Sequence, residues 1–119
     1  MENPQILEIV ASDNDVKLVK FIPSRILDEI QINAIGQQVI SLIDEGARKI
    51  VFDFSNVDHL SSSALGMLIT IKKRLDNVNG TLKLCNIQSQ IFQVFKITRL
   101  DKLFEIYDTA TEALTSFAK

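Results

Sequence analysis

The chain has 119 residues, the length of one domain, and 46% of them are apolar, which is enough to build one compact core. Its 13 basic and 15 acidic residues leave a net charge of −2, so a strongly basic nucleic-acid surface is not indicated. One cysteine, Cys85, and one histidine cannot form a disulfide or a zinc site. With no apolar stretch near the roughly 18 residues of a membrane helix and no signal-peptide pattern, we expect a cytoplasmic protein without metal or cofactor.

The first half of the chain predicts two strands, a helix and a central strand. Runs rich in Val, Ile, Leu and Phe at residues 6–10 and 16–22 flank a polar segment and predict a hairpin or two neighbouring strands. From Glu29 onward the apolar residues recur at helical spacing until a glycine stop at Gly46. The nearly continuous apolar run at residues 49–54 is typical of a central strand with both faces covered.

The second half repeats a helix and strand alternation. A helix is predicted to begin within Ser61–Ser63 and to end at residues 77–80, followed by a strand at 81–85 and a helix from Ile87 to Phe95. A last strand at 103–107 leads to a helix that begins at a capping box, Thr109 to Glu112. This order predicts an α/β fold in one domain, residues 1–119, with a mixed, mostly parallel sheet and about four helices.

The segment from Ser61 to Gly66 is the most informative part, because a run of small residues lies between a buried strand and a helix. Loops at this position carry function in open α/β sheets. Free amides and the helix dipole would tolerate a phosphate on a serine there. Ala64 and Gly66 keep the first turn narrow, so another molecule could approach. Serines at a helix start are common N-caps, and by spacing alone such a run is more often a cap than a modified site.

The run at residues 51–68, VFDFSNVDHLSSSALGML, resembles the core motif of STAS domains of the anti-sigma factor antagonist type. In that family the serine just before Gly-Leu-Gly is phosphorylated by an anti-sigma factor that is also a protein kinase. The resemblance places this acceptor at Ser63, with Ser62 as the less favoured acceptor. The aspartate of the family motif falls on Ser61 and its first glycine on Ala64, so the carboxylate beside the acceptor is missing from the motif.

Two further segments are similar to the same family. Residues 25–28 resemble its Gly-x-Leu-Asp segment, with Arg25 in place of the glycine and Asp28 matching the acidic residue that faces the partner. Residues 80–104 resemble its strand, helix and final Leu-Phe ending. The resemblance therefore runs from about residue 16 to residue 117.

The resemblance implies a non-enzymatic regulator of sigma-factor-dependent transcription. Its partner would be an anti-sigma factor with serine kinase activity, phosphorylation of Ser63 would end the binding, and a serine phosphatase would reverse it. Neither nucleic acid nor membrane is expected as a direct partner. The residues expected to contact the partner lie near the acceptor or on the exposed helix face, together with Lys73: Asp28, Asp58, Ser61, Ser62, Ala64, Leu65, Gly66, Met67, Thr70 and Arg74.

The main alternative is a STAS scaffold or sensor module that is never phosphorylated, which Ser61 in place of the aspartate keeps open. A phosphoacceptor role for Asp53 would need an acidic pair for Mg²⁺ and a strand-ending lysine, and Asp13 with Asp15 lies between two adjacent strands. A hydrolase would need a Gly-x-Ser-x-Gly elbow, which the serine run lacks, and a small-ligand site would need a glycine-rich loop. Both are disfavoured, and Cys85 is predicted to be a small buried side chain.

Overall fold

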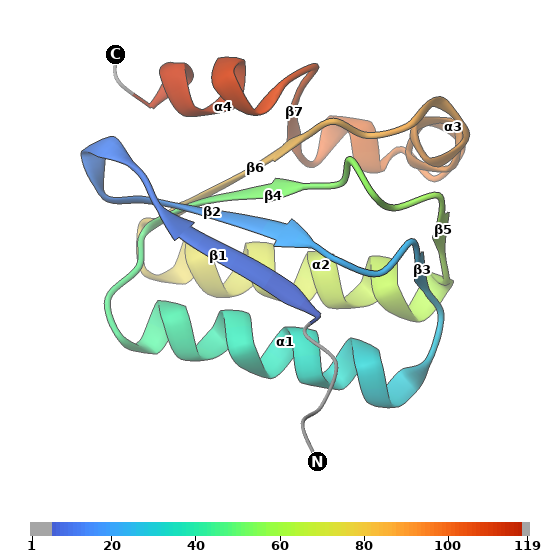
Figure 1. Cartoon of the computed structure of the whole chain (residues 1–119), viewed down its shortest axis with the longest axis horizontal. Helices are drawn as coiled ribbons and strands as arrows, with labels where there is room; N and C mark the ends of the chain where they lie inside the picture. Colours follow the sequence, from blue (N-terminus) through green and yellow to red (C-terminus); the bar gives the residue numbers. More distant parts are fainter. Residues whose placement is uncertain (1–5, 118–119) are drawn as a thin grey trace.

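The computed structural model describes residues 6–117, which form a layered α/β structure (Figure 1). The main sheet has the strand order β1-β2-β4-β6-β7. β1 is antiparallel to β2, and the other neighbours are parallel. The bounds of these strands are β1 Leu7–Ala11, β2 Val16–Phe21, β4 Lys49–Asp53, β6 Thr81–Cys85 and β7 Glu105–Tyr107.

The helices cover both faces of this sheet. α1 and α2 lie side by side against one face, and α4 lies across the opposite face (Figure 1). α3 packs through Ile91 and Phe95 onto the same core as α1 and α2. The helices are α1 Glu29–Asp44, α2 Ser62–Asn77, α3 Ser89–Ile97 and α4 Ala110–Ser116. The predicted fold class, a mixed and mostly parallel sheet with four helices in the described range, is confirmed, and residues 1–5 and 118–119 of the predicted domain lie outside that range.

The central strand β4 explains the continuous apolar run, because alternate side chains enter two separate cores. Phe52 points to the α1 and α2 side, where the centroid of its ring lies 5.1 Å from the ring centroid of Phe21. Val51 points to the other side and packs with Cys85 and with Ala113 of α4. Both β4 side chains have an exposed fraction of 0%. The middle of β4, Ile50 to Phe52, is therefore apolar at every position, as expected for a strand buried on both faces.

The helix boundaries follow the predicted caps. Gly46 has φ +113°, a conformation that glycine adopts without strain, and it follows the end of α1. The hydroxyl of Thr109 accepts a hydrogen bond from the amide of Glu112 at 3.1 Å, so the predicted capping box opens α4. β7 begins at Glu105 and not at residue 103, because Leu100–Lys102 forms a 3-10 turn before it.

Two short strands were not predicted. β3 (Arg25–Ile26) and β5 (His59–Leu60) form a separate parallel pair, in segments that the sequence indicated only as loops after Phe21 and after Phe54. A pair of two-residue strands leaves no periodicity to detect, because alternation needs about four residues or more. The packing of the surrounding elements brings these two segments side by side, and no local pattern does so. The β3–β5 pair in turn positions the candidate site.

The free cysteine behaves as predicted. Cys85 ends β6 and is fully buried, so it is a core side chain and not an exposed nucleophile. Burial raises the pKa of its thiol from 9.0 to about 12, and the negative charge of Asp53 adds to the rise. The thiol therefore stays protonated in the folded chain at pH values where an exposed thiol ionises.

This shift predicts a loss of stability at alkaline pH. Above the ordinary value of 9.0 the unfolded chain loses the thiol proton while the folded chain keeps it up to about pH 12, so the free energy of unfolding falls as pH rises through that window. From about pH 8 to about pH 10 the wild type should lose about 1.4 kcal/mol more than Cys85→Ala. Urea unfolding of both proteins at the two pH values under reducing conditions measures this difference in the free energy of unfolding. Equal losses in the two proteins would show that Cys85 is not the cause.

Candidate functional site

The pairing of β3 with β5 brings the first turns of α1 and α2 together. The carbonyl of Ser24 accepts hydrogen bonds from the amides of Asp58 and His59 at 2.8 and 3.2 Å. The amide of Ser61 donates to the carbonyl of Ile26 at 3.1 Å. Each strand leads directly into a helix, so the two parallel helices begin next to each other at one end of the molecule (Figure 1). Residues of the Asp28 segment and of the serine run thereby become neighbours.

Both helices begin at side-chain caps that the sequence offers. Asp28 accepts a hydrogen bond from the amide of Ile30 at 3.1 Å, and the hydroxyl of Ser61 accepts one from the amide of Ala64 at 3.1 Å. Serine and aspartate are comparable N-caps, so Ser61 keeps the capping function that an aspartate would have at this position. The substitution removes a negative charge and leaves the start of α2 satisfied.

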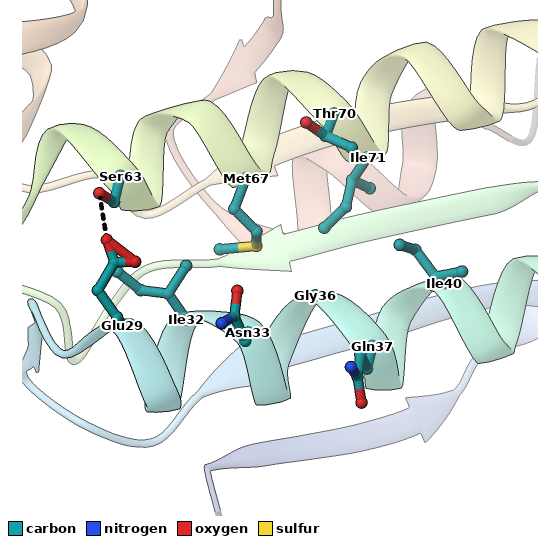
Figure 2. A pocket seen from close by; sticks show the side chains of 10 residues that line it. All are labelled: Glu29, Ile32, Asn33, Gly36, Gln37, Ile40, Ser63, Met67, Thr70 and Ile71. Carbon is teal, nitrogen blue, oxygen red and sulfur yellow. Dashed lines mark hydrogen bonds between the residues drawn. The ribbon is translucent and has the colours of Figure 1, made fainter.

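The three serines have separate roles. Ser61 is the cap, whereas Ser62 and Ser63 are exposed in the first turn of α2. The hydroxyl of Ser63 donates a hydrogen bond to a carboxylate oxygen of Glu29, 3.0 Å away on α1 (Figure 2). Glu29 is not among the site residues expected from the sequence. An acidic residue in a first helical turn is common, and only the tertiary structure brings it to a serine 34 positions later.

A groove of about 290 Å³ runs between α1 and α2 with the pair of Ser63 and Glu29 at one end (Figure 2). Met67 is half-buried and reaches down toward Gly36, whose missing side chain leaves room for it: a Cβ there would lie 3.4 Å from the Met67 Cγ. The α1–α2 groove has a mixed apolar and polar lining, formed by Glu29, Ile32, Asn33, Gly36, Gln37, Ile40, Ser63, Met67, Thr70 and Ile71.

The structure corrects two of the expected contact residues. The side chains of Ala64 and Leu65 are 0% and 8% exposed and belong to the core, because they occupy the buried stripe of α2. They therefore support the surface from beneath and offer little or no side-chain area for contact. Met67, expected to be exposed, is half-buried in the groove. The remaining expected positions are at least partly accessible, among them Thr70 at the α1–α2 groove and the exposed residues Gly66, Lys73 and Arg74 of α2.

Exposed apolar side chains lie at the start of α1. Ile30 is 79% exposed in the first turn of α1, and Leu27, just before that helix, is 43% exposed. Neither residue was singled out from the sequence, although Ile30 lies off the buried stripe formed by Ile32, Ile35 and Val39. Together with Asp28 and Asp58 they make this end of the molecule both apolar and acidic, and Asp58 lies 2.6 Å from the His59 ring nitrogen Nδ1.

Asp53 has a structural environment. It is buried, and its carboxylate accepts hydrogen bonds from the amide of Ser55 at 2.9 Å and from the side chain of Asn86 at 3.1 Å. Asp15 precedes β2, whose first residue pairs with Lys49, whereas Asp53 ends β4, so the two acids lie at opposite ends of the sheet. This separation removes the acidic cluster that a phosphoacceptor Asp53 would require.

The described residues form neither a metal-binding cluster nor a membrane-spanning helix. Over residues 6–117, His, Cys, Asp and Glu side chains do not gather in groups of three or more that could hold a metal ion. None of the helices in that range is both long and apolar enough to cross a membrane.

The family model of the STAS domain matches residues 11–113, and the chain belongs to this family. A relative from Thermotoga neapolitana, provisionally named an anti-sigma factor antagonist, is 35% identical over 72 residues. That match covers 60% of this chain and 64% of the relative, just under two thirds of its length.

Solved structures share the fold. A provisionally named anti-sigma factor antagonist from Thermotoga maritima superposes with a TM-score of 0.83 at 24% identity, covering 95% of both chains. The Bacillus cell fate determinant SpoIIAA in its phosphorylated form superposes with a TM-score of 0.73 at 19% identity, covering 92% of this chain and 97% of that one. At these identities the likeness concerns the architecture.

The cap assigned to Ser61 can be tested by stability. Ser61→Ala should lower the free energy of unfolding by about 1 kcal/mol, because the amide of Ala64 loses its acceptor. Ser61→Asp should restore most of that loss, since a carboxylate caps equally well and favours a helix N-terminus. Ser62→Ala is the matched control and should change stability by less than about 0.5 kcal/mol. Urea unfolding measures all three, and equal effects of the two alanine variants would contradict the cap.

Proposed function

We propose that the chain is an anti-sigma factor antagonist controlled by phosphorylation of Ser63. In the unmodified state it binds an anti-sigma factor with serine kinase activity, which frees a sigma factor for transcription. The observation that carries the proposal is the exposed Ser63 hydroxyl in the first turn of α2, at a surface that is apolar and acidic together. The names of the relatives and the STAS family support the same function.

The modification is a phosphoryl transfer from ATP to serine. The Ser63 Oγ–P bond forms while the bond between the γ-phosphorus and the oxygen bridging to the β-phosphate breaks, and ADP leaves. A base on the kinase takes the hydroxyl proton. The start of α2 suits the product, because its free amides and dipole favour a negative charge. Ser62 is the less favoured acceptor, and a serine phosphatase would remove the phosphate.

The docking surface consists of the exposed residues around this hydroxyl. Leu27 and Ile30 supply apolar area, and Asp28 and Asp58 supply acidic groups, so a partner with apolar side chains and a basic rim would complement it. A phosphate adds about −1.5 to −2 charge at the centre of this surface. Desolvating that charge beside two carboxylates opposes docking. The protein then acts in the cytoplasm, through binding and without catalysis of its own.

Intact mass spectrometry tests the acceptor. Incubation with the candidate anti-sigma kinase from the same genome and Mg²⁺·ATP should add one phosphate, about 80 Da, to the wild type and to Ser62→Ala. Ser63→Ala should gain none. No gain in the wild type, with the kinase active on another substrate, would contradict the phosphorylation switch. That result would instead support a STAS scaffold or sensor that is never phosphorylated.

Gly66→Ala separates docking from folding. Gly66 lies within α2 and is exposed, and an added Cβ would meet no atom within 4 Å, so the variant should be more stable by up to about 1 kcal/mol. A methyl group on the docking surface should nevertheless weaken binding to the anti-sigma factor by about tenfold, an energy of about 1.4 kcal/mol, the cost of a poorly fitting group at an interface. Calorimetric titration measures the affinity. Thr115→Ala, on α4 across the sheet, is the control, and unchanged affinity of Gly66→Ala would place the contact elsewhere.

A further inference from the structure

A hydrogen bond between Glu29 and Ser63 directly connects α1 and α2 at the docking surface. The hydroxyl of Ser63 donates its hydrogen to the Glu29 carboxylate over 3.0 Å (Figure 2). Both groups are exposed, and both lie in the first turn of a helix whose start is fixed by a cap and by the β3–β5 pair. The distance between them is therefore set by the fold and not by two flexible loops.

Each helix start favours a negative charge on its own. The amino end of α1 stabilises the carboxylate of Glu29, and the amino end of α2 would stabilise a phosphate on Ser63. The two charges together would lie within hydrogen-bonding distance, where unit charges of like sign repel strongly. Among the described residues that line the α1–α2 groove, Glu29 alone carries a charge, so the lining provides no cation to neutralise the pair.

We propose that Glu29 is a sensor of phosphorylation at Ser63, which couples the modification to the packing of α1 on α2. In the unmodified chain the Ser63 hydroxyl holds the Glu29 carboxylate and so ties the two first turns together. A phosphoryl group replaces the donated hydrogen with negative oxygens, so attraction becomes repulsion. The first turn of α1 then separates from α2 and the groove opens at this end. This inference rests on the proposed function in one respect, namely that Ser63 is the residue that is phosphorylated.

The consequence extends beyond the acceptor itself. The first turn of α1 carries Ile30 and follows Asp28, so a displacement of that turn also moves the apolar and acidic groups of the docking surface. Phosphorylation would thus change the shape of the surface as well as its charge. The family motif has a carboxylate at the position of Ser61. In this chain a carboxylate beside the serines comes from Glu29 of α1, where it would respond to a phosphate on Ser63.

The test uses phosphoserine installed at position 63 by genetic code expansion, which requires no kinase. Phosphoserine should raise the equilibrium constant for unfolding about tenfold in the wild type and less than about twofold in Glu29→Gln, since the amide can donate to the phosphate. Glu45→Gln removes the same charge after the far end of α1, about 24 Å away, and should behave as the wild type. At about 1 M salt the wild-type effect should shrink, because screening is then strong over about 3 Å.

Amide hydrogen exchange locates the effect. The amide of Ile32 donates to the carbonyl of Asp28 at 2.9 Å in the first turn of α1. Its exchange should accelerate about tenfold when phosphoserine is present in the wild type, and not in Glu29→Gln, because only the carboxylate is repelled. Equal effects of phosphoserine in both backgrounds, or unchanged exchange at Ile32, would overturn the proposal.

The two proposals fail in distinguishable ways. Enzymatic phosphorylation of Ser63 without coupling to Glu29 would overturn the sensor alone. Coupling in the phosphoserine protein, together with a chain that the kinase does not modify, would support the sensor and contradict the proposed switch.

Discussion

The parallel pairing of β3 with β5 is the constraint on which the candidate site depends. Two residues from each strand, reinforced by backbone hydrogen bonds from Asp58 and His59 to Ser24, hold two chain segments together that are more than 30 residues apart. Each segment continues at once into a helix. This pair, together with the packing of α1 against α2, fixes the relative position of their first turns. The hydrogen bond of Ser63 to Glu29 depends on that relation.

Residues 61–65 have three structural roles at the start of α2. Ser61 satisfies the backbone at the start of α2, which leaves Ser62 and Ser63 with hydroxyls at the surface. Ala64 and Leu65 then enter the core and fix the orientation of the turn. A rigid first turn is a good platform for a modified serine, since the start of a helix favours the negative charge of the added group.

The starts of α1 and α2 share one electrostatic property. Each one stabilises an anion, as a helix N-terminus generally does, yet the fold places them so close that two anions oppose each other. Under the proposed switch, this surface would have two states that differ by one phosphate. Its apolar members, Leu27 and Ile30, lie on the same segment as Glu29, so charge and shape are connected through the first turn of α1.

The sequence by itself determined the main sheet, the helices and the position of the serine run at the start of α2, because these depend on local patterns. The apolar run of β4, the glycine after α1 and the capping box of α4 each acted within a few residues, and the structure agrees with them. The tertiary structure decided which side chains meet across the molecule. Glu29 beside Ser63 and Met67 above Gly36 follow from how two helices lie against one sheet. Such contacts between distant segments leave no periodic pattern in a single chain, so no local signal could have predicted them.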